Sequence, residues 1–481
     1  MRKRAAAILL ALCMALTLLP TAAFATEEGG AAAPVEQPAQ QEEKQEGQQD
    51  EQQPEETPQQ PEEQAKEQPE AKPAEQPEQQ PQESVAQGEP AVQSANQGIA
   101  LLADEHKHCI CGGSVTAGDH TSHSDVAYTA WNGTDGISYT NNTAYVYLTG
   151  SATISDHLTV DGKTLYLCLN GKTLSSNGTA KIQIKNGGRL VLCDCQSGGA
   201  FKGATQSVWG GACVYLYKST LDMFGGKLTG GKVADKKGGG GAIALDDKNC
   251  VFNMYGGEIS GNYGGNYGGA IFQNFAKNKP NATGGNFNMY GGVIKNNSAK
   301  NGGAFFSTTG GTINMTGGTI SGNTATQNSN DAGGGAIYMR GNGTINISGS
   351  AQITGNSSSL DGGAILMGWG TINISDSAKI NNNTASRWGG AICLRQDSNQ
   401  STTLNMRGGE ISGNKATKEG GAVHVLDKDC QFFLYDGKIT GNTSGDGGAI
   451  YLNQEPSWLI MQGGEISGNT ATGNGGGVYI Y

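Results

Sequence analysis

The chain has 481 residues, of which 77 are glycine, and its formal net charge is −11 at pH 7. Glycine at this level without a strict period of three excludes collagen, and it argues against a helix-rich enzyme because each glycine inside a helix costs about 1 kcal/mol relative to alanine. The sequence has no basic stripe, and we therefore expect no nucleic-acid partner.

Residues 1–25 have the pattern of a secretory signal peptide. A basic start at Arg2–Arg4 precedes the apolar run Ala5–Leu19, and Ala23–Ala25 supplies small residues before a cleavage site. The apolar run is shorter than the ~20 residues that a membrane-spanning helix needs. We therefore expect a secreted or extracellular chain, associated with the cell surface, with no transmembrane segment after cleavage.

Residues 26–98 form a low-complexity tract rich in Glu, Gln, Pro and Ala. It holds eighteen acidic residues against three basic ones, together with ten of the 13 prolines. Few apolar side chains are available to offset the entropy of ordering, so we expect a disordered linker. A spacer that holds a domain off a surface and a solubilising tail are both consistent with this composition.

Residues 99–143 carry a cluster of histidine and cysteine. Imidazole and thiolate are ligands that zinc prefers, and four of them complete a tetrahedron. The Cys-x-Cys spacing differs from the usual zinc motif, and a His-rich linker end or a redox pair remains an alternative. The candidate zinc ligands are His106, His108, Cys109, Cys111, His120 and His123.

Internal repeats dominate residues 144–481. A Gly-Gly-Ala phrase such as Gly334–Ala336 recurs, mostly at intervals of 27–34 residues, and each unit also contains an Ile-x-x-Asn phrase such as Ile320–Asn323. Each unit holds three short segments in which apolar residues alternate with polar ones, and this alternation predicts half-buried strands. Gly and Asn between the segments predict turns. The sequence thus predicts an all-β, right-handed parallel β-helix solenoid with three strands per coil and about 12 coils.

The asparagine of each unit is expected to recur every ~4.8 Å along the solenoid. An amide at a buried turn can donate to one neighbouring coil and accept from the other, which favours a structural ladder. A row of ligand-binding side chains is the alternative. The ladder residues are Asn262, Asn297, Asn323, Asn356, Asn383, Asn414, Asn442 and Asn469.

These repeats resemble the right-handed parallel β-helix repeats of polymorphic outer-membrane, autotransporter-type surface proteins. They also resemble repeats of adhesin-like secreted proteins of gut bacteria, and the solenoid resembles the pectate-lyase-like fold. The resemblance implies a surface or secreted role in contact with a host-surface protein or a polysaccharide. The chain departs from the autotransporter pattern because no C-terminal barrel follows the repeats. It stops within a first strand at Val478–Tyr481, so we expect an incomplete reading frame or a covered end.

An enzyme of the polysaccharide lyase or glycoside hydrolase class would need clustered carboxylates on one face. Acidic residues at the ends of the first strands, such as Asp246 and Asp427, lie six coils apart, and those after Gly-Gly, such as Glu258 and Glu410, are mostly not in neighbouring coils. We therefore assign no catalytic residue and expect a non-enzymatic, adhesive or carbohydrate-binding protein. A lyase or hydrolase and a structural spacer remain alternatives. Candidate ligand-contacting aromatics are Tyr255, Tyr290, Tyr435, Trp369 and Trp388.

Overall fold

The computed structural model describes residues 107–109, 125–207, 210–234, 238–273, 284–327, 333–396, 400–453 and 456–481. The chain divides into two compact units, Met1–Ser94 and Ala95–Tyr481, and every described residue belongs to the second. The expected signal peptide and nearly all of the expected linker at 26–98 belong to the first unit, and both lie outside the described residues. The described residues contain strands and turns but no helix.

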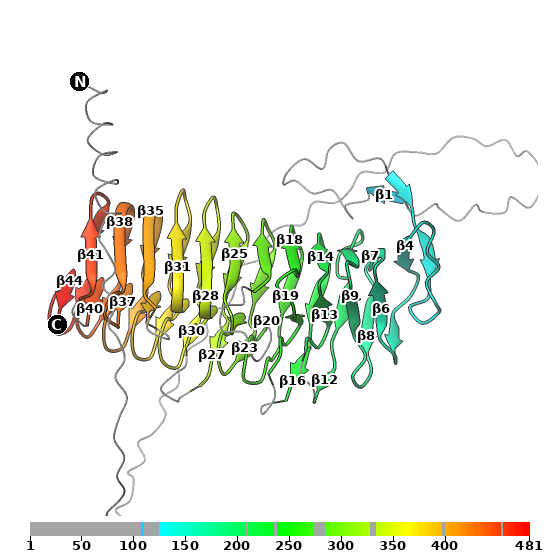
Figure 1. The fold of residues 1–481 in the computed structure, drawn as a ribbon, viewed down its shortest axis with the longest axis horizontal. Helices are drawn as coiled ribbons and strands as arrows, with labels where there is room; N and C mark the ends of the chain where they lie inside the picture. The colour runs from blue at the N-terminus through cyan, green and yellow to red at the C-terminus, as the bar shows by residue number, and fades with distance from the viewer. Residues whose placement is uncertain are drawn as a thin grey trace, which may run out of the picture. The chain divides into compact units, whose positions relative to one another are not determined.

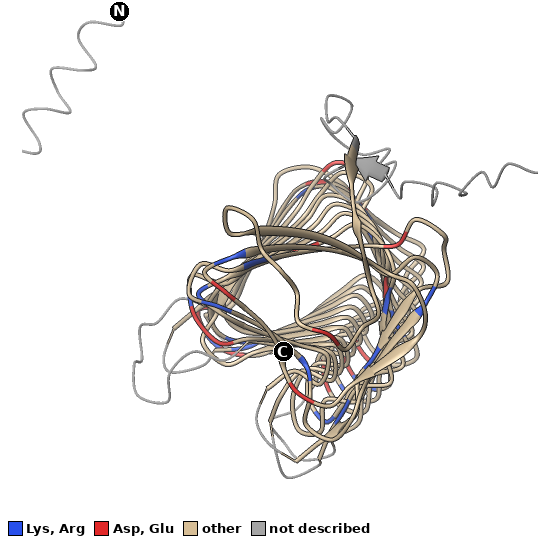
Figure 2. Ribbon diagram, turned by 90° about the vertical axis from the view of Figure 1, so that its right-hand side faces the viewer, with Lys and Arg blue, Asp and Glu red and all other residues tan. Residues whose placement is uncertain are grey.

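Parallel strands stack into a β-solenoid of about eleven turns, which confirms the all-β parallel architecture and lies close to the 12 coils expected (Figure 1). Figure 2 looks along the coils and shows successive turns superimposed around one axis, with acidic and basic residues both present at the outer corners. Each turn contributes to three walls, which we call the first, second and third in chain order.

The first wall begins each Gly-Gly-Ala unit. Its strands are β6 (Leu158–Asp161), β9 (Ile182–Lys185), β13 (Val214–Tyr217), β17 (Ile243–Leu245), β20 (Ile271–Gln273), β24 (Phe305–Ser307), β28 (Ile337–Ile347), β31 (Ile365–Ile374), β34 (Ile392–Leu394), β37 (Val423–Val425), β40 (Ile450–Leu452) and β44 (Val478–Ile480).

The second wall follows after one corner. Because β28 and β31 run through that corner without a break, they belong to both walls. The other strands of the second wall are β3 (Thr129–Trp131), β4 (Thr143–Leu148), β7 (Thr164–Cys168), β10 (Arg189–Cys193), β14 (Thr220–Met223), β18 (Val251–Met254), β21 (Asn286–Met289), β25 (Gly311–Met315), β35 (Thr402–Ser412), β38 (Gln431–Thr440) and β41 (Trp458–Met461).

The third wall shares β35 and β38 with the second wall in the same manner. Its other strands are β5 (Ala152–Ile154), β8 (Thr173–Ser176), β11 (Ala200–Lys202), β15 (Lys227–Thr229), β19 (Glu258–Ser260), β22 (Val293–Lys295), β26 (Thr319–Ser321), β29 (Gln352–Thr354), β32 (Lys379–Asn381) and β42 (Glu465–Ser467).

The solenoid also contains two-residue strands, which the prediction of three strands per coil did not include. They form two small parallel sheets: the strands of the larger sheet lie just after the repeated asparagines, and the two strands of the smaller sheet lie at the equivalent place in two earlier turns, which have no such asparagine. The antiparallel pair β1 (Lys107–Cys109) and β2 (Asp125–Ala127) is separate from both sheets. The short strands are β12 (Thr205–Gln206) and β16 (Lys232–Val233) in one sheet, and β23 (Ser298–Ala299), β27 (Thr324–Ala325), β30 (Ser357–Ser358), β33 (Thr384–Ala385), β36 (Lys415–Ala416), β39 (Thr443–Ser444) and β43 (Thr470–Ala471) in the other.

The core is a continuous column of inward side chains, one set per turn. Ile337 and Met339 of the first wall, Ile313 and Met315 of the second and Ile320 of the third are all fully buried, as the alternation predicted. Cys213, Cys250, Cys393 and Cys430 are also fully buried and form no disulfide, so they act as small side chains that fill space between strands.

The repeated Gly-Gly follows from how closely the turns approach at one corner. Gly334 has a φ of +69°, a left-handed conformation that strongly favours glycine. A Cβ added to Gly335 would lie 2.1 Å from the carbonyl oxygen of Gly363 in the next turn. Both positions therefore need glycine, the first for its backbone angle and the second for the space between turns.

The eight repeated asparagines form one hydrogen-bonded column, which we call the inner ladder. Asn383 Nδ2 donates to Asn414 Oδ1 at 3.0 Å and to the carbonyl oxygen of Ile353 at 3.0 Å, and the backbone N–H of Asn383 donates to Asn414 Oδ1 at 2.9 Å. Asn262, the first member, accepts from the backbone N–H of Gly231, the residue that replaces asparagine one turn earlier. Each amide therefore satisfies backbone groups of two turns that would otherwise be buried without partners.

We expect Asn383→Ala to lower the free energy of unfolding by about 3 kcal/mol, because it removes the side-chain partners of two buried backbone groups, the N–H of Asn356 and the carbonyl of Ile353. Urea titration of the full chain measures the loss. Asn373→Ala, at a half-exposed position on the second wall, is the matched control and should cost less than about 1 kcal/mol. Equal losses in the two variants would contradict a special role for the inner ladder.

Candidate binding face

The outer side of the second wall presents two parallel rows of polar side chains. Thr312, Thr344, Thr371 and Thr403 occupy one row in register, and all four are partly exposed. Asparagines two residues further along each strand form the second row: Asn253, Asn288, Asn314, Asn346, Asn373 and Asn405. We call this surface the Thr–Asn face.

The asparagines of this face form a second column, the outer ladder. Asn314 Nδ2 donates to Asn288 Oδ1 at 2.8 Å, and Asn346 Nδ2 donates to Asn314 Oδ1 at 2.7 Å. Each amide uses one of its two N–H groups and one of its two oxygen lone pairs in the ladder, and the ladder therefore holds a row of polar groups rigidly toward solvent. The direction of donation is toward the previous turn, opposite to that of the inner ladder.

Charged groups close the N-terminal end of the outer ladder. Asn253 Nδ2 donates to Asp222 Oδ1 at 2.7 Å, and Arg189 Nε donates to Asp222 Oδ2 at 2.6 Å. Asp222 is almost fully buried although half of the Arg189 side chain is exposed. The carboxylate thus receives the last donor of the ladder and is itself neutralised by the guanidinium.

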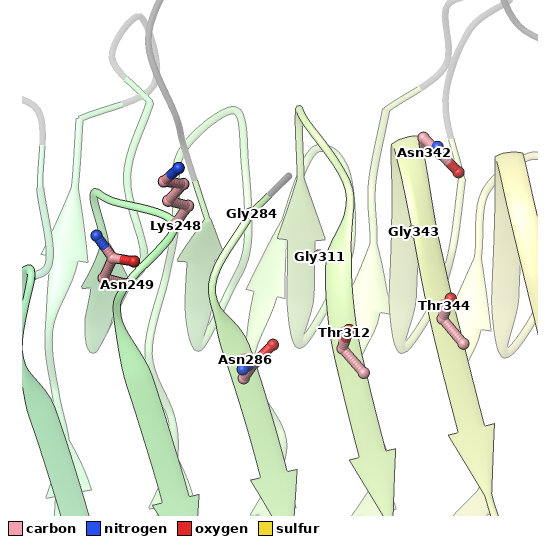
Figure 3. A pocket seen from close by; sticks show the side chains of 9 residues that line it. All are labelled: Lys248, Asn249, Gly284, Asn286, Gly311, Thr312, Asn342, Gly343 and Thr344. Carbon is pink, nitrogen blue, oxygen red and sulfur yellow. The ribbon is translucent and has the colours of Figure 1, made fainter. Parts of the chain in front are cut away.

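A polar pocket lies over the beginning of the Thr–Asn face (Figure 3). Asn286, Thr312 and Thr344 point outward from three successive strands, and Lys248 and Asn249 come from the turn before β18. Lys248 is the one charged residue among those that line it. The pocket thus offers hydroxyl, amide and backbone groups at regular spacing, with a single cation.

The five candidate aromatic residues lie at four different places. Tyr255 is stacked between Phe224 and Tyr290, with ring centroids 4.5 and 4.9 Å away, so its two ring faces are covered. Tyr290 is 41% exposed at the end of this stack. The Arg407 guanidinium lies 3.9 Å from the ring centre of Tyr435. Of the candidate aromatics, only Tyr255 and Tyr290 are therefore in contact with each other. A sugar could contact Tyr290 at the end of this stack, but it would not meet a row of exposed rings.

The two tryptophans lie apart from that stack. Trp369 is half-buried on β31, in register with Asn342 at the edge of the pocket. Trp388 lies at the Gly-Gly corner of the first wall, under the Arg387 guanidinium at 4.0 Å from the ring centre. Trp369 thus belongs to the candidate face, whereas Trp388 belongs to a different cluster.

The candidate zinc ligands cannot be placed together. His108 and Cys109 are part of β1, whereas His106, Cys111, His120 and His123 lie outside the described residues. Within the ranges that the structure describes, no group of three or more His, Cys, Asp or Glu side chains is arranged to hold a metal ion. The zinc site stays a prediction.

A second polar cluster, which the sequence analysis missed, lies on the outer side of the first wall. The residues just before Gly-Gly include Asp361, Trp388, Glu419 and Asp446, and the last three bridge in parallel from turn to turn. Asp361 is fully buried and accepts from Arg387 Nε at 2.7 Å. The fixed place of these residues, directly before Gly-Gly in successive repeats, is the sequence signal that could have revealed the cluster.

His424 lies beneath this cluster in the middle of β37. It is fully buried, neither ring nitrogen has a hydrogen-bond partner, and its Nε2 lies 3.7 Å from Glu419 Oε2. Burial, assisted by the Arg387 charge, lowers the pKa of His424 to about 3. Burial and the neighbouring Asp446 raise the pKa of Glu419. The imidazole is therefore neutral at pH 7 and the Glu419 carboxyl holds a proton more readily than usual.

Residues 377–395 match the Chlamydia polymorphic membrane protein repeat. Comparison with curated proteins and with solved structures finds no match. The matched repeat and the β-solenoid together fit a surface or outer-membrane protein.

A search of the described residues for helices that could cross a lipid bilayer finds none of sufficient length and apolar character.

Stability should fall on acidification in a way that depends on His424. An unfolded histidine titrates near pH 6.5, whereas folded His424 does so near 3. Between these values the unfolded state binds the proton and the folded state does not, so the His424 contribution is complete above pH 6.5 and declines toward pH 3. Glu419, whose pKa is raised, changes the pH dependence of stability in the opposite sense. Its effect is common to the unchanged protein and to a variant altered only at His424.

We expect the thermal midpoint of His424→Leu to fall less between pH 7 and pH 4 than that of the unchanged protein. Differential scanning calorimetry measures both. His157→Gln, at an exposed position where partial burial and the Lys181 charge also lower the histidine pKa, serves as the control and should change the pH profile less than His424→Leu does. Parallel pH profiles for His424→Leu and the unchanged protein would contradict the assignment.

Proposed function

We propose that this protein is a non-enzymatic, adhesive surface protein that binds polysaccharide, or a carbohydrate-bearing host surface, through the Thr–Asn face. The observation that carries the proposal is the outer ladder, a rigid, half-exposed row of amides beside a row of threonine hydroxyls. The matched repeat supports a surface location. Secretion through the expected signal peptide and display on the acidic linker belong to the same proposal.

The dimensions of the face favour an extended polymer. Tyr290 lies beside one end of the polar rows and Tyr435 beside the other, separated by five turns or about 24 Å at the usual strand spacing. A polymer laid along the solenoid axis would meet equivalent hydroxyl and amide groups at each turn. An uncharged or weakly acidic sugar chain fits best, because Lys248 is the only charged side chain among the described residues that line the pocket.

The contacts on such an open face are individually weak. Each hydrogen bond to a ligand replaces one to water and contributes only about 0.5–1.5 kcal/mol. Affinity must come from many equivalent contacts on a surface that is already ordered, so that little entropy is lost on binding. The hydrogen-bonded amides of the outer ladder meet this requirement.

Placing a lysine side chain at Thr344, in the middle of the face, should block an extended ligand. We expect Thr344→Lys to weaken retention on an immobilised polysaccharide at least tenfold, because the side chain rises from a flat contact surface. Thr384→Lys is the matched control, since Thr384 is exposed on β33, outside the three walls, and should bind normally. Affinity electrophoresis across neutral and acidic polysaccharides measures both variants. Equal retention of the two, or no retention of the unchanged protein, would overturn the proposal.

A second candidate function is glycoside hydrolysis at the first-wall cluster. Glu419 and Asp446 occupy neighbouring turns, and the raised pKa of Glu419 suits a general acid, while a second carboxylate is the other group that this chemistry needs. Glu419 and Asp446 thus provide carboxylates in neighbouring turns, which the ends of the first strands and the positions after Gly-Gly do not.

Release of reducing ends from the same polysaccharides separates the two functions. For the binding function we expect no release by the unchanged protein over long incubation. Release that Glu419→Gln abolishes, and that Thr344→Lys only slows, would establish the hydrolase instead.

A further inference from the structure

Three cysteines meet at the carboxyl ends of two neighbouring second-wall strands. Cys168 ends β7 and Cys193 ends β10, and the two are paired in register. Both are fully buried, whereas Cys195, two residues beyond β10, is exposed. The Sγ atoms of Cys168 and Cys195 are 3.4 Å apart. The other thiols of the described residues, such as Cys213 and Cys393, are single buried fillers.

We propose that Cys168 and Cys195 form a disulfide that joins two successive turns of the solenoid. A bonded pair has its sulfur atoms about 2.05 Å apart, so closing a gap of 3.4 Å needs a small side-chain rotation and no change of fold. The exposed Cys195 is the thiol that an oxidant reaches first. Cys193 also hydrogen-bonds to Cys168, but it is fully buried, so an oxidant reaches it after Cys195 and we expect it to stay reduced.

The chemistry is thiol–disulfide exchange with a disulfide oxidant such as oxidised glutathione or a thiol oxidoreductase. The Cys195 thiolate attacks the oxidant disulfide, forms a mixed disulfide and releases one thiol of the oxidant. Cys168 then loses its proton and attacks the Cys195 sulfur, which releases the second thiol. Two cysteine thiols are oxidised to one disulfide, and the oxidant disulfide is reduced to two thiols.

The loop that carries Cys195 is held in position before oxidation. Asp194 accepts from the backbone N–H of Gly171 in the previous turn at 2.7 Å and from that of Gly199 in its own loop at 2.6 Å, which closes the loop and ties it to the previous turn. Cys195 Sγ also lies 3.6 Å from Asn170 Oδ1. A fixed loop lowers the entropy lost on closing the bond.

Although Cys195 is exposed at the surface, its partial burial and its hydrogen bond with Cys168 raise the pKa of its thiol to about 12. The thiolate fraction at neutral pH is therefore small, and closure should be slow without a catalyst and faster as pH rises.

The bond would join two turns that the inner ladder does not connect. The inner ladder begins at Asn262, so the turns that contain β7 and β10 have no asparagine column between them. A covalent link between these turns would restrict the unfolded chain over the segment from Cys168 to Cys195. It would thus replace, near the N-terminal end, the cross-turn connection that asparagines supply further along.

The test treats the purified full-length chain with oxidised glutathione at pH 8 and maps its peptides by mass spectrometry without reduction. We expect a peptide pair joined through Cys168 and Cys195, with two hydrogens lost, and a rise of several degrees in the thermal midpoint that reduction reverses. Cys193→Ser should keep the link and the shift, whereas Cys195→Ser should lose both.

Mapping of the unchanged protein decides the proposal even if a variant fails to fold. A link from Cys168 to Cys193, a link from Cys195 to Cys109 or Cys111, or no link after prolonged oxidation would each overturn it. These outcomes are independent of polysaccharide binding, which needs no covalent bond.

Discussion

The structure depends on one constraint, the parallel stacking of near-identical turns at the ~4.8 Å spacing of hydrogen-bonded strands. At that distance, each residue meets its own equivalent above and below. An apolar residue then extends the core, and a glycine allows close backbone contact. An asparagine can form its side-chain hydrogen bonds with the equivalent asparagines of the neighbouring turns. Residues without this property, such as a lone charge, cannot be repeated in the interior without cost.

This constraint explains what could be predicted from the sequence. Ile313, Met315 and Ile320 repeat with a period that only stacked strands satisfy, and they are buried as predicted. The inner asparagines could be identified because their spacing to the preceding isoleucine never changes. The continuation of β28 and β35 from one wall into the next could not be predicted. It depends on whether the chain bends at a corner, and the contacts of each turn with its neighbours determine that bend.

The candidate sites were harder to predict, because the surroundings of their side chains depend on residues that differ from one turn to the next. Stacking of Tyr255 against Phe224 and Tyr290 covers ring faces that outward placement alone suggested were open. The outer asparagines were hidden because an outward polar residue in an alternating strand is the ordinary expectation. The approach of Glu419 to His424 depends on how the chain turns at Gly420, whose φ is +67°, and the alternating pattern does not show that this turn brings the two side chains to within 3.7 Å of each other.

The two asparagine ladders have an electrostatic consequence. Every side-chain amide is a dipole, and a column of amides donating in one sense aligns those dipoles along the axis, as peptide groups are aligned in a helix. The amide-to-amide bonds of the inner column donate toward the C-terminal end and those of the outer column toward the N-terminal end, so the contributions of these bonds oppose each other. A solenoid built in this way accumulates little axial polarisation as turns are added. Duplication of a repeat unit can therefore change the length of the protein without an electrostatic penalty that grows with each copy.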